Sequence, residues 1–143
     1  MKTVAVAVAG LLCCAASGGQ IPAPDQAACF TNEGASTYDV MGDVKVEGGT
    51  LWFKSQPGLN IRLSGPCLLR RGGTPYELGS PGTYAVQCYP PSTNEPFYSA
   101  VTYPPFASDG ILGWVEVDTG DILYATTALR CDVYHQTEEG GKP

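Results

Sequence analysis

Apolar and polar residues alternate with a period of two along much of the chain. The pattern runs over residues 38–46, is interrupted by Gly48-Gly49, resumes over 51–53 and continues over 59–63. Such alternation is typical of β-strands with one buried face. Because glycine tolerates the backbone angles of tight turns, the glycine pair predicts a hairpin. No window of helical length carries an apolar stripe with a period of 3.6 residues.

The second half of the chain predicts further strands, separated by turn residues. Short apolar runs cover 67–69, 83–89 and 97–103, and a last hairpin joins 111–117 to 122–133 through a polar turn that contains Gly120. Residues 89–96 contain three prolines, which lack the backbone donor that a strand needs, so this segment is expected to be a loop.

The sequence therefore predicts an all-β fold of about seven or eight short strands. The 18 glycines and 12 prolines interrupt the chain too often for helices. A small β-sandwich is the expected architecture, with a small β-barrel as the alternative. We expect a single domain over residues 29–136, preceded by a leader over 18–28 and followed by a flexible tail over 137–143.

Residues 1–17 have the pattern of a cleaved signal peptide. Lys2 precedes an uncharged apolar run over residues 3–14, and the small residues Ala15 and Ser17 follow it. The run is shorter than the roughly 20 residues that a membrane-spanning helix needs. We therefore expect a secreted, extracellular protein from which Cys13 and Cys14 are removed together with the signal peptide.

Four cysteines remain in the expected mature chain, namely Cys29, Cys67, Cys88 and Cys131. An exported chain of this size is expected to pair them in two disulfides. Three pairings are possible, and sequence alone does not choose among them. The preferred hypothesis joins Cys67 to Cys88, as a staple between neighbouring strands, and Cys29 to Cys131, as a tie between the ends of the domain.

The charge of the chain excludes some partners. Without Lys2, seven basic residues face 14 acidic ones, a net charge of −7. A nucleic-acid-binding protein needs a basic face to displace counterions from phosphate, so no nucleic-acid partner is expected. No later apolar stretch is long enough to span a bilayer, so no membrane span is expected either.

The sequence offers no metal or cofactor site. The segments 81–88 and 110–113 superficially resemble the end of a copper-binding cupredoxin, whose cysteine ligand lies at the end of a strand. A copper site of that type needs two imidazoles and a thiolate, whereas His135 is the single histidine of the chain. Cofactors and metals are therefore expected to be absent, and His135 is expected to be an exposed polar residue.

Acidic residues near the last hairpin are the strongest argument for catalysis. Asp118-Thr119-Gly120 matches the tripeptide that carries the catalytic carboxylate of aspartic proteases, but such enzymes need two copies. Glu116 and Asp118 share one face of the predicted strand, and glycosidases use paired carboxylates. A solvated outer face explains the pair more simply, so a small hydrolase remains an alternative.

Recognition is the function that the composition favours. Tyrosine and phenylalanine crowd around the proline-rich loop, and aromatic residues are enriched at binding surfaces. Basic residues could hold an anionic group of a partner. The candidate binding residues are Tyr89, Phe97, Tyr98, Tyr103, Phe106, Arg70 and Arg71, with Arg62 as a further basic residue nearby.

We therefore expect a secreted binding protein, effector-like or toxin-like, that recognises an extracellular protein or glycan. The hydrolase is one alternative, and a carrier of a small apolar ligand inside a barrel is the other.

Overall fold

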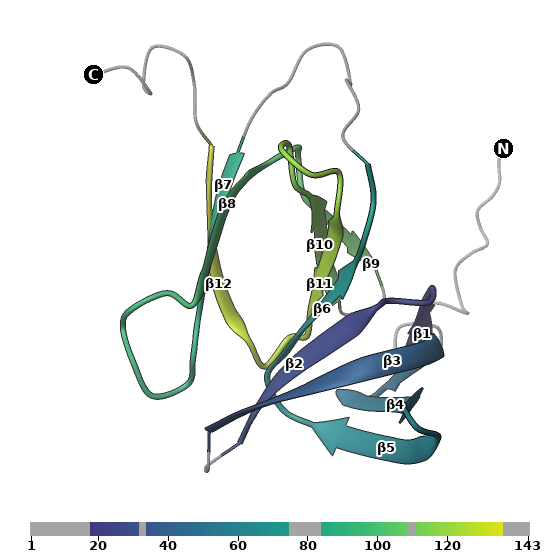
Figure 1. Cartoon of the computed structure of the whole chain (residues 1–143). Coiled ribbons are helices and arrows are strands. Elements are labelled where there is room, and N and C mark those ends of the chain that lie inside the picture. Colours follow the sequence, from purple (N-terminus) through teal and green to yellow (C-terminus); the bar gives the residue numbers. More distant parts are fainter. Residues whose placement is uncertain (1–17, 32–33, 75–83, 109–110, 136–143) are drawn as a thin grey trace, which may run out of the picture.

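The computed structural model describes residues 18–31, 34–74, 84–108 and 111–135, and these contain strands and no helix. Two sheets are visible in Figure 1, one of nine strands and one of three. The strands are β1 (Gly18–Ile21), β2 (Gln26–Thr31), β3 (Gly34–Glu47), β4 (Thr50–Ser55), β5 (Leu59–Ser64), β6 (Cys67–Arg71), β7 (Tyr84–Tyr89), β8 (Tyr98–Thr102), β9 (Phe106–Ser108), β10 (Ile111–Val115), β11 (Ile122–Ala125) and β12 (Arg130–His135).

All described strand pairs are antiparallel. The large sheet has the order β5-β4-β3-β2-β6-β11-β10-β9, and β1 also pairs with β3. The small sheet has the order β12-β7-β8 and faces β6, β11 and β10 across the interior (Figure 1). A bridge between Thr102 and Glu116 brings the end of β8 beside the end of β10. The arrangement is sandwich-like and does not close into the barrel that was the alternative.

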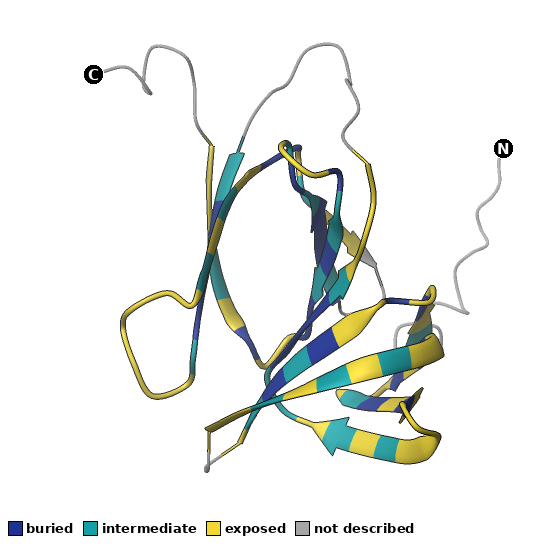
Figure 2. Ribbon diagram, viewed as in Figure 1, coloured by how far each residue is buried: buried dark blue, intermediate teal, exposed yellow. Residues whose placement is uncertain are grey.

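The interior consists of two hydrophobic cores on opposite faces of the large sheet. The first core lies among β1–β6 and contains Val44, Leu51 and Leu69, and the second lies under the small sheet and contains Trp114 and Leu123. Buried or half-buried residues alternate with exposed ones along much of β3 and β4, as the alternating bands of Figure 2 show. The predicted period of two is thus the period of burial in this region.

Strand β6 belongs to both cores. Cys67 and Leu69 lie in the first core, whereas Leu68, between them, lies in the second. Successive side chains of a strand point to opposite faces, so a strand covered on both faces is apolar without alternation. This explains why residues 67–69 form a continuous apolar run in the sequence.

The preferred disulfide pairing was wrong. The disulfides join Cys29 to Cys67 and Cys88 to Cys131. Each links two residues that lie directly opposite on adjacent strands, with Cα atoms 4.1 and 4.0 Å apart. The error arose because neighbouring strands were expected to be neighbours in sequence, whereas β2 pairs with β6 and β7 pairs with β12.

Several predicted strand boundaries also differ from the structure. Residues 18–28, expected to be a leader, contain β1 and the start of β2, and the predicted strand over 122–133 is two strands in different sheets. The additional short strand β9 raises the number of described strands to twelve. The signal segment 1–17 and the tail 137–143 lie outside the described residues.

Candidate functional site

The structure separates the aromatic residues that the sequence grouped together. Tyr89 and Tyr103 are buried, although neither belongs to the two hydrophobic cores, and the guanidinium of Arg130 covers the ring of Tyr89. Phe106 is exposed, but a Cβ atom built on Gly113 would lie 2.5 Å from the Phe106 ring. The ring of Phe106 therefore packs on the bare backbone of β10 and is separated from the other candidates.

Three of the predicted binding residues, Arg70, Phe97 and Tyr98, line one groove between the two sheets. Its volume is about 210 Å³, close to that of a single large side chain. Exposed polar side chains of β2 and β3 lie at the same groove. The described residues that line it are Gln26, Ala28, Thr37, Leu68, Arg70, Phe97, Tyr98 and Leu123.

Phe97 is held at the groove by the predicted loop before β8. Its backbone N–H donates to the carbonyl of Cys88 over 2.9 Å, and its ring packs edge-on against Phe30 with centroids 4.7 Å apart. The side chain nevertheless remains exposed. Because three prolines restrict the backbone of residues 90–96, the loop presents Phe97 at low conformational cost.

A buried carboxylate, Glu116, lies behind the groove. Arg70 donates from Nη1 and Nη2 to its two oxygens over 3.2 and 3.3 Å, and the Tyr98 hydroxyl donates over 2.6 Å. Thr119 Oγ1 donates over 2.7 Å. The side chain of Glu116 is 10% exposed, so these donors replace the water that the charge would otherwise require.

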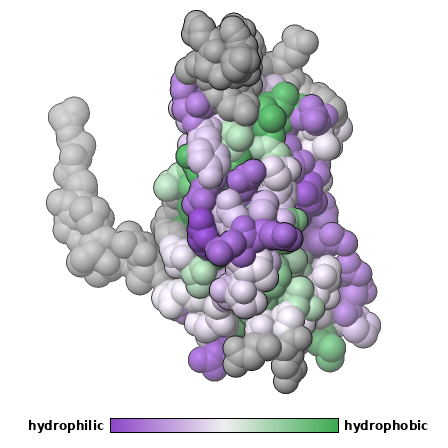
Figure 3. Space-filling view, turned by 90° about the vertical axis from the view of Figure 1, so that its left-hand side faces the viewer, coloured by the Kyte–Doolittle hydropathy of each residue, from purple (hydrophilic) through white to green (hydrophobic). Residues whose placement is uncertain are grey.

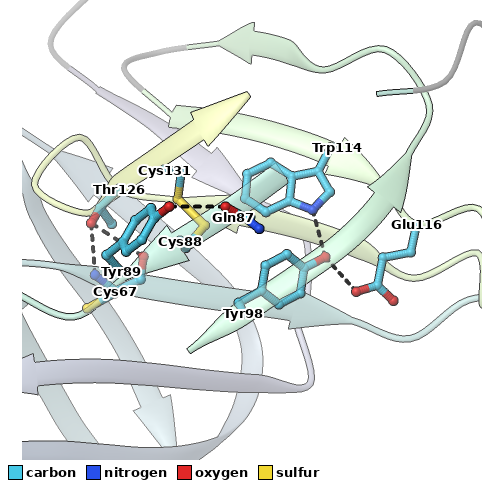
Figure 4. The surroundings of a disulfide bond; sticks show 9 residues. All are labelled: Cys67, Gln87, Cys88, Tyr89, Tyr98, Trp114, Glu116, Thr126 and Cys131. Carbon is cyan, nitrogen blue, oxygen red and sulfur yellow. Dashed lines mark hydrogen bonds between the residues drawn. A yellow bond between two sulfur atoms is a disulfide. The ribbon is translucent and has the colours of Figure 1, made fainter. Parts of the chain in front are cut away.

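The network continues on both sides of Glu116. Trp114 Nε1 donates to the Tyr98 hydroxyl over 2.9 Å, so a chain of hydrogen bonds leads from the second core to the groove, beside the Cys88–Cys131 disulfide (Figure 4). On the other side Arg70 Nη1 also donates to Asp121 over 2.5 Å. Arg70, Glu116 and Asp121 together carry one net negative charge at neutral pH.

The network changes the pKa values of its members. Burial, and then the hydrogen bond to Glu116, raise the pKa of Tyr98 well above its usual range, so its hydroxyl stays protonated and acts as a donor. Burial alone would lower the pKa of Arg70, but hydrogen bonds to Glu116 and Asp121 outweigh that effect and raise it.

These contacts correct the interpretation of Glu116 as part of a solvated face. Its two oxygens accept four hydrogen bonds from the side chains around them. A catalytic carboxylate must reach its substrate or a water molecule, and Glu116 has little acceptor capacity left for either. Asp118 is exposed in the turn that follows. The geometry therefore favours a structural role for Glu116 over the paired-carboxylate hydrolase.

The segment 70–73, which contains the candidate binding residues Arg70 and Arg71, is also fixed by carboxylates. Gly72 N–H donates to Asp25 over 2.6 Å and Gly73 N–H to Asp121 over 2.9 Å. A Cβ atom on Gly73 would lie 2.2 Å from the carbonyl oxygen of Gly120, so only glycine fits this approach. Gly73 and the two aspartates are visible in the sequence. Because Asp25 and Asp121 are far from this segment along the chain, the sequence does not show that they contact it.

The remaining candidates lie apart from the groove. His135 is exposed at the end of β12, where its ring packs edge-on against Tyr84. Arg71 is exposed on β6, next to Arg70. Among the described residues, no cluster of three or more His, Cys, Asp and Glu side chains is placed to hold a metal ion. The described part also contains no helix with the length and apolarity needed to cross a bilayer.

Comparisons with protein-family models, with curated proteins and with solved structures find no match to this chain.

Proposed function

We propose that this protein is a secreted recognition domain, effector-like or toxin-like, that binds an extracellular protein at the groove of Arg70, Phe97 and Tyr98. Two disulfides between buried or half-buried cysteines support an oxidising compartment. The apolar run over residues 3–14 supports export by a signal peptide.

The observation that carries the binding proposal is the exposed ring of Phe97 at the mouth of a preformed groove. Binding energy concentrates in aromatic and arginine residues beside well-packed pockets. A groove of about 210 Å³ accepts one inserted side chain of the partner. The partner is a basic protein, because Arg70, Glu116 and Asp121 carry a net negative charge and the whole chain carries −6.

Export is tested by expressing the full-length chain in a secreting host and measuring the intact mass of the released protein. The expected product lacks residues 1–17 and four hydrogens, and gives no reaction with a thiol reagent. A full-length intracellular chain with reduced thiols would contradict export.

Binding is tested with the secreted protein on an array of purified extracellular proteins. Phe97→Ala is expected to weaken a saturable interaction at least tenfold. Leu59→Ala is the matched control, because Leu59 is also an exposed apolar side chain but lies on β5, outside the groove lining. Equal binding by wild type and Phe97→Ala would contradict the proposal, as would turnover of a peptide or glycan that Asp118→Asn abolishes.

The space between the sheets argues against the carrier. Trp114, Val86 and Leu123 are almost completely buried there, so their side chains fill the interior that a small apolar ligand would need.

A further inference from the structure

A second surface of the molecule, distinct from the groove of Phe97, combines an exposed tryptophan with cations. It is the outer face of β3, β4 and β5, opposite the first core. Lys45, Trp52 and Arg62 lie in register across these three strands, and Trp52 is 39% exposed. We name this surface the Trp52 face, made up of Met41, Asp43, Lys45, Glu47, Trp52, Lys54, Asn60 and Arg62.

The side chains of this face do not serve the core. Leu51 and Phe53, the neighbours of Trp52 on β4, point the other way and are buried. Met41 is also exposed on this face, so the two side chains form an apolar area surrounded by polar residues. An apolar area with a polar rim is typical of an interaction surface.

A groove of about 550 Å³ runs along one side of the tryptophan. Met41, Asp43, Lys54 and Asn60 line it together with Trp52. Arg62 is not part of this lining and stacks over the ring, with its guanidinium carbon 4.6 Å from the ring centroid. The arginine thus supports the indole and places a positive charge at its edge.

Two cations of the Trp52 face are available to a ligand. Among the described residues, neither Lys54 nor Arg62 forms an ion pair. Lys45 lies 3.7 Å from Glu47, but both side chains are more than half exposed, so this pair is weak. Asp43 accepts a hydrogen bond from the backbone N–H of Ala23 over 2.8 Å, so one of its oxygens is already engaged.

We propose that the Trp52 face binds an acidic polysaccharide whose sugar rings each carry one carboxylate, a polyuronate. The flat indole suits the apolar face of a pyranose ring, and Asn60 and Asp43 are suited to hydrogen bonds with sugar hydroxyls. Lys54 and the guanidinium fork of Arg62 suit carboxylates on successive rings.

The pattern of the face selects this ligand over other polyanions. One aromatic ring flanked by single cations matches a chain that repeats one ring and one charge. A densely sulfated chain would be served better by a cluster of cations without an aromatic residue. The surrounding protein is acidic, so the cations on this face are a local departure from the charge of the molecule.

The test measures binding of the secreted protein to polygalacturonate oligosaccharides by titration calorimetry. An unsubstituted glucan and dextran sulfate of equal length are the comparison ligands. Polygalacturonate is expected to bind more tightly than both, and binding should quench tryptophan fluorescence, because Trp52 is the exposed tryptophan and Trp114 is buried. Trp52→Ala is expected to weaken binding at least tenfold, and Lys54→Gln and Arg62→Gln several-fold each.

The matched control is Arg130→Gln. Arg130 also stacks on an aromatic ring, 4.2 Å from the centroid of Tyr89, but it lies on β12 in the other sheet. Its loss should leave polygalacturonate binding within twofold. Phe97→Ala should also bind normally, so failure at this face is distinguishable from failure of the proposed protein-binding groove.

Four results would overturn the inference: no binding of polygalacturonate, unchanged binding by Trp52→Ala, an equal loss in Arg130→Gln, or tighter binding of dextran sulfate. The thermal unfolding temperature of each variant shows that it is folded, and Trp52→Phe, which keeps an aromatic ring, should restore most of the affinity.

Discussion

The two cores of this protein are assembled in different ways. The first core lies largely among β2, β3, β4 and β5, which follow one another along the chain and pair in that order. The second core combines β6 with β11, and β7 with β12, which are distant in sequence. The first region is thus built mainly from local hairpins, whereas the second combines the hairpins β7–β8 and β10–β11 with non-local pairings that cost more loop-closure entropy.

Their polar content differs as well. Four polar residues are buried in the part of the chain that the structure describes. Thr102, Glu116 and Thr126 lie on strands or turns around the second core, and Ser55 lies beside the first. The Thr126 hydroxyl, in the turn after β11, accepts a hydrogen bond from the backbone N–H of Cys67 and donates one to the carbonyl of Gly65. Apolar alternation thus accompanies the consecutive hairpins, whereas the non-local half is also positioned by buried hydrogen bonds.

The outer face of the small sheet is mostly hydrophilic, with only limited hydrophobic areas (Figure 3).

The largest expected effects come from removing the disulfides as Ala pairs. The two loops contain 38 and 43 residues, so each bridge contributes about 4 kcal/mol in the chain-entropy model. The spatial consequences should differ. Loss of Cys88–Cys131 should expose the amides of β12, which pairs only with β7 among the described strands, and loss of Cys29–Cys67 should affect both cores through β6. Denaturant unfolding measures the loss of stability, and hydrogen exchange shows which strands become exposed. Identical exchange patterns in the two variants would contradict the expected difference between the two regions.

Leu69→Ala and Leu68→Ala form a matched pair on opposite faces of β6. Leu69 is completely buried in the first core, and its loss should lower the free energy of unfolding by about 3 kcal/mol. Leu68 also lines the groove, so its truncation should cost about 2 kcal/mol. Only Leu68→Ala should shift the native fluorescence of Trp114, its neighbour in the second core, to the red. The opposite order of stabilities, or a shift in both variants, would refute the assignment of faces.

Arg70→Met should destabilise the protein more than Arg62→Met. The first change leaves Glu116 buried without its cation and is expected to cost about 2 kcal/mol, because removing one partner of a buried ion pair strands the other charge. Arg62 lies on an exposed face and makes no ion pair among the described residues, so its loss should cost less than about 0.5 kcal/mol. Urea unfolding at neutral pH measures the free energy of unfolding of both variants. Equal losses in the two variants would contradict a structural role for the network around Glu116.

The smallest expected effect is a pH dependence caused by Tyr98. Because the fold raises its pKa above the unfolded value of about 10, the unfolded chain releases this proton first. The contribution of Tyr98 is therefore complete below pH 10 and declines as the pH rises further. Between pH 9 and 10.5 the wild type should lose more stability than Tyr98→Phe, by less than about 1 kcal/mol because the ring is partly exposed. Parallel pH profiles would contradict this.

The candidate site could be predicted from sequence only in part. The proline-rich loop and the exposure of Phe97 follow from local chemistry, since prolines end the preceding strand and leave the next residues at the surface. The burial of Glu116 could not be predicted, because its position between Val115 and Val117 indicates a solvent-facing side chain, and only the approach of Arg70 and Tyr98 encloses it. Trp52 was recognised as a residue of a strand, but its exposure depends on which face of β4 meets the core.

The β class, the hairpin at Gly48-Gly49 and the apolar face of each strand in the first region follow from the order of the amino acids. These features depend on backbone angles and on alternation within a few residues; both turn glycines indeed have positive φ angles, of 58° and 84°. The cysteine pairs, the two-sided burial of β6 and the network around Glu116 depend instead on contacts between strands that are distant in sequence. Alternation identifies the inward face of a strand but carries no information about which distant strand will lie beside it.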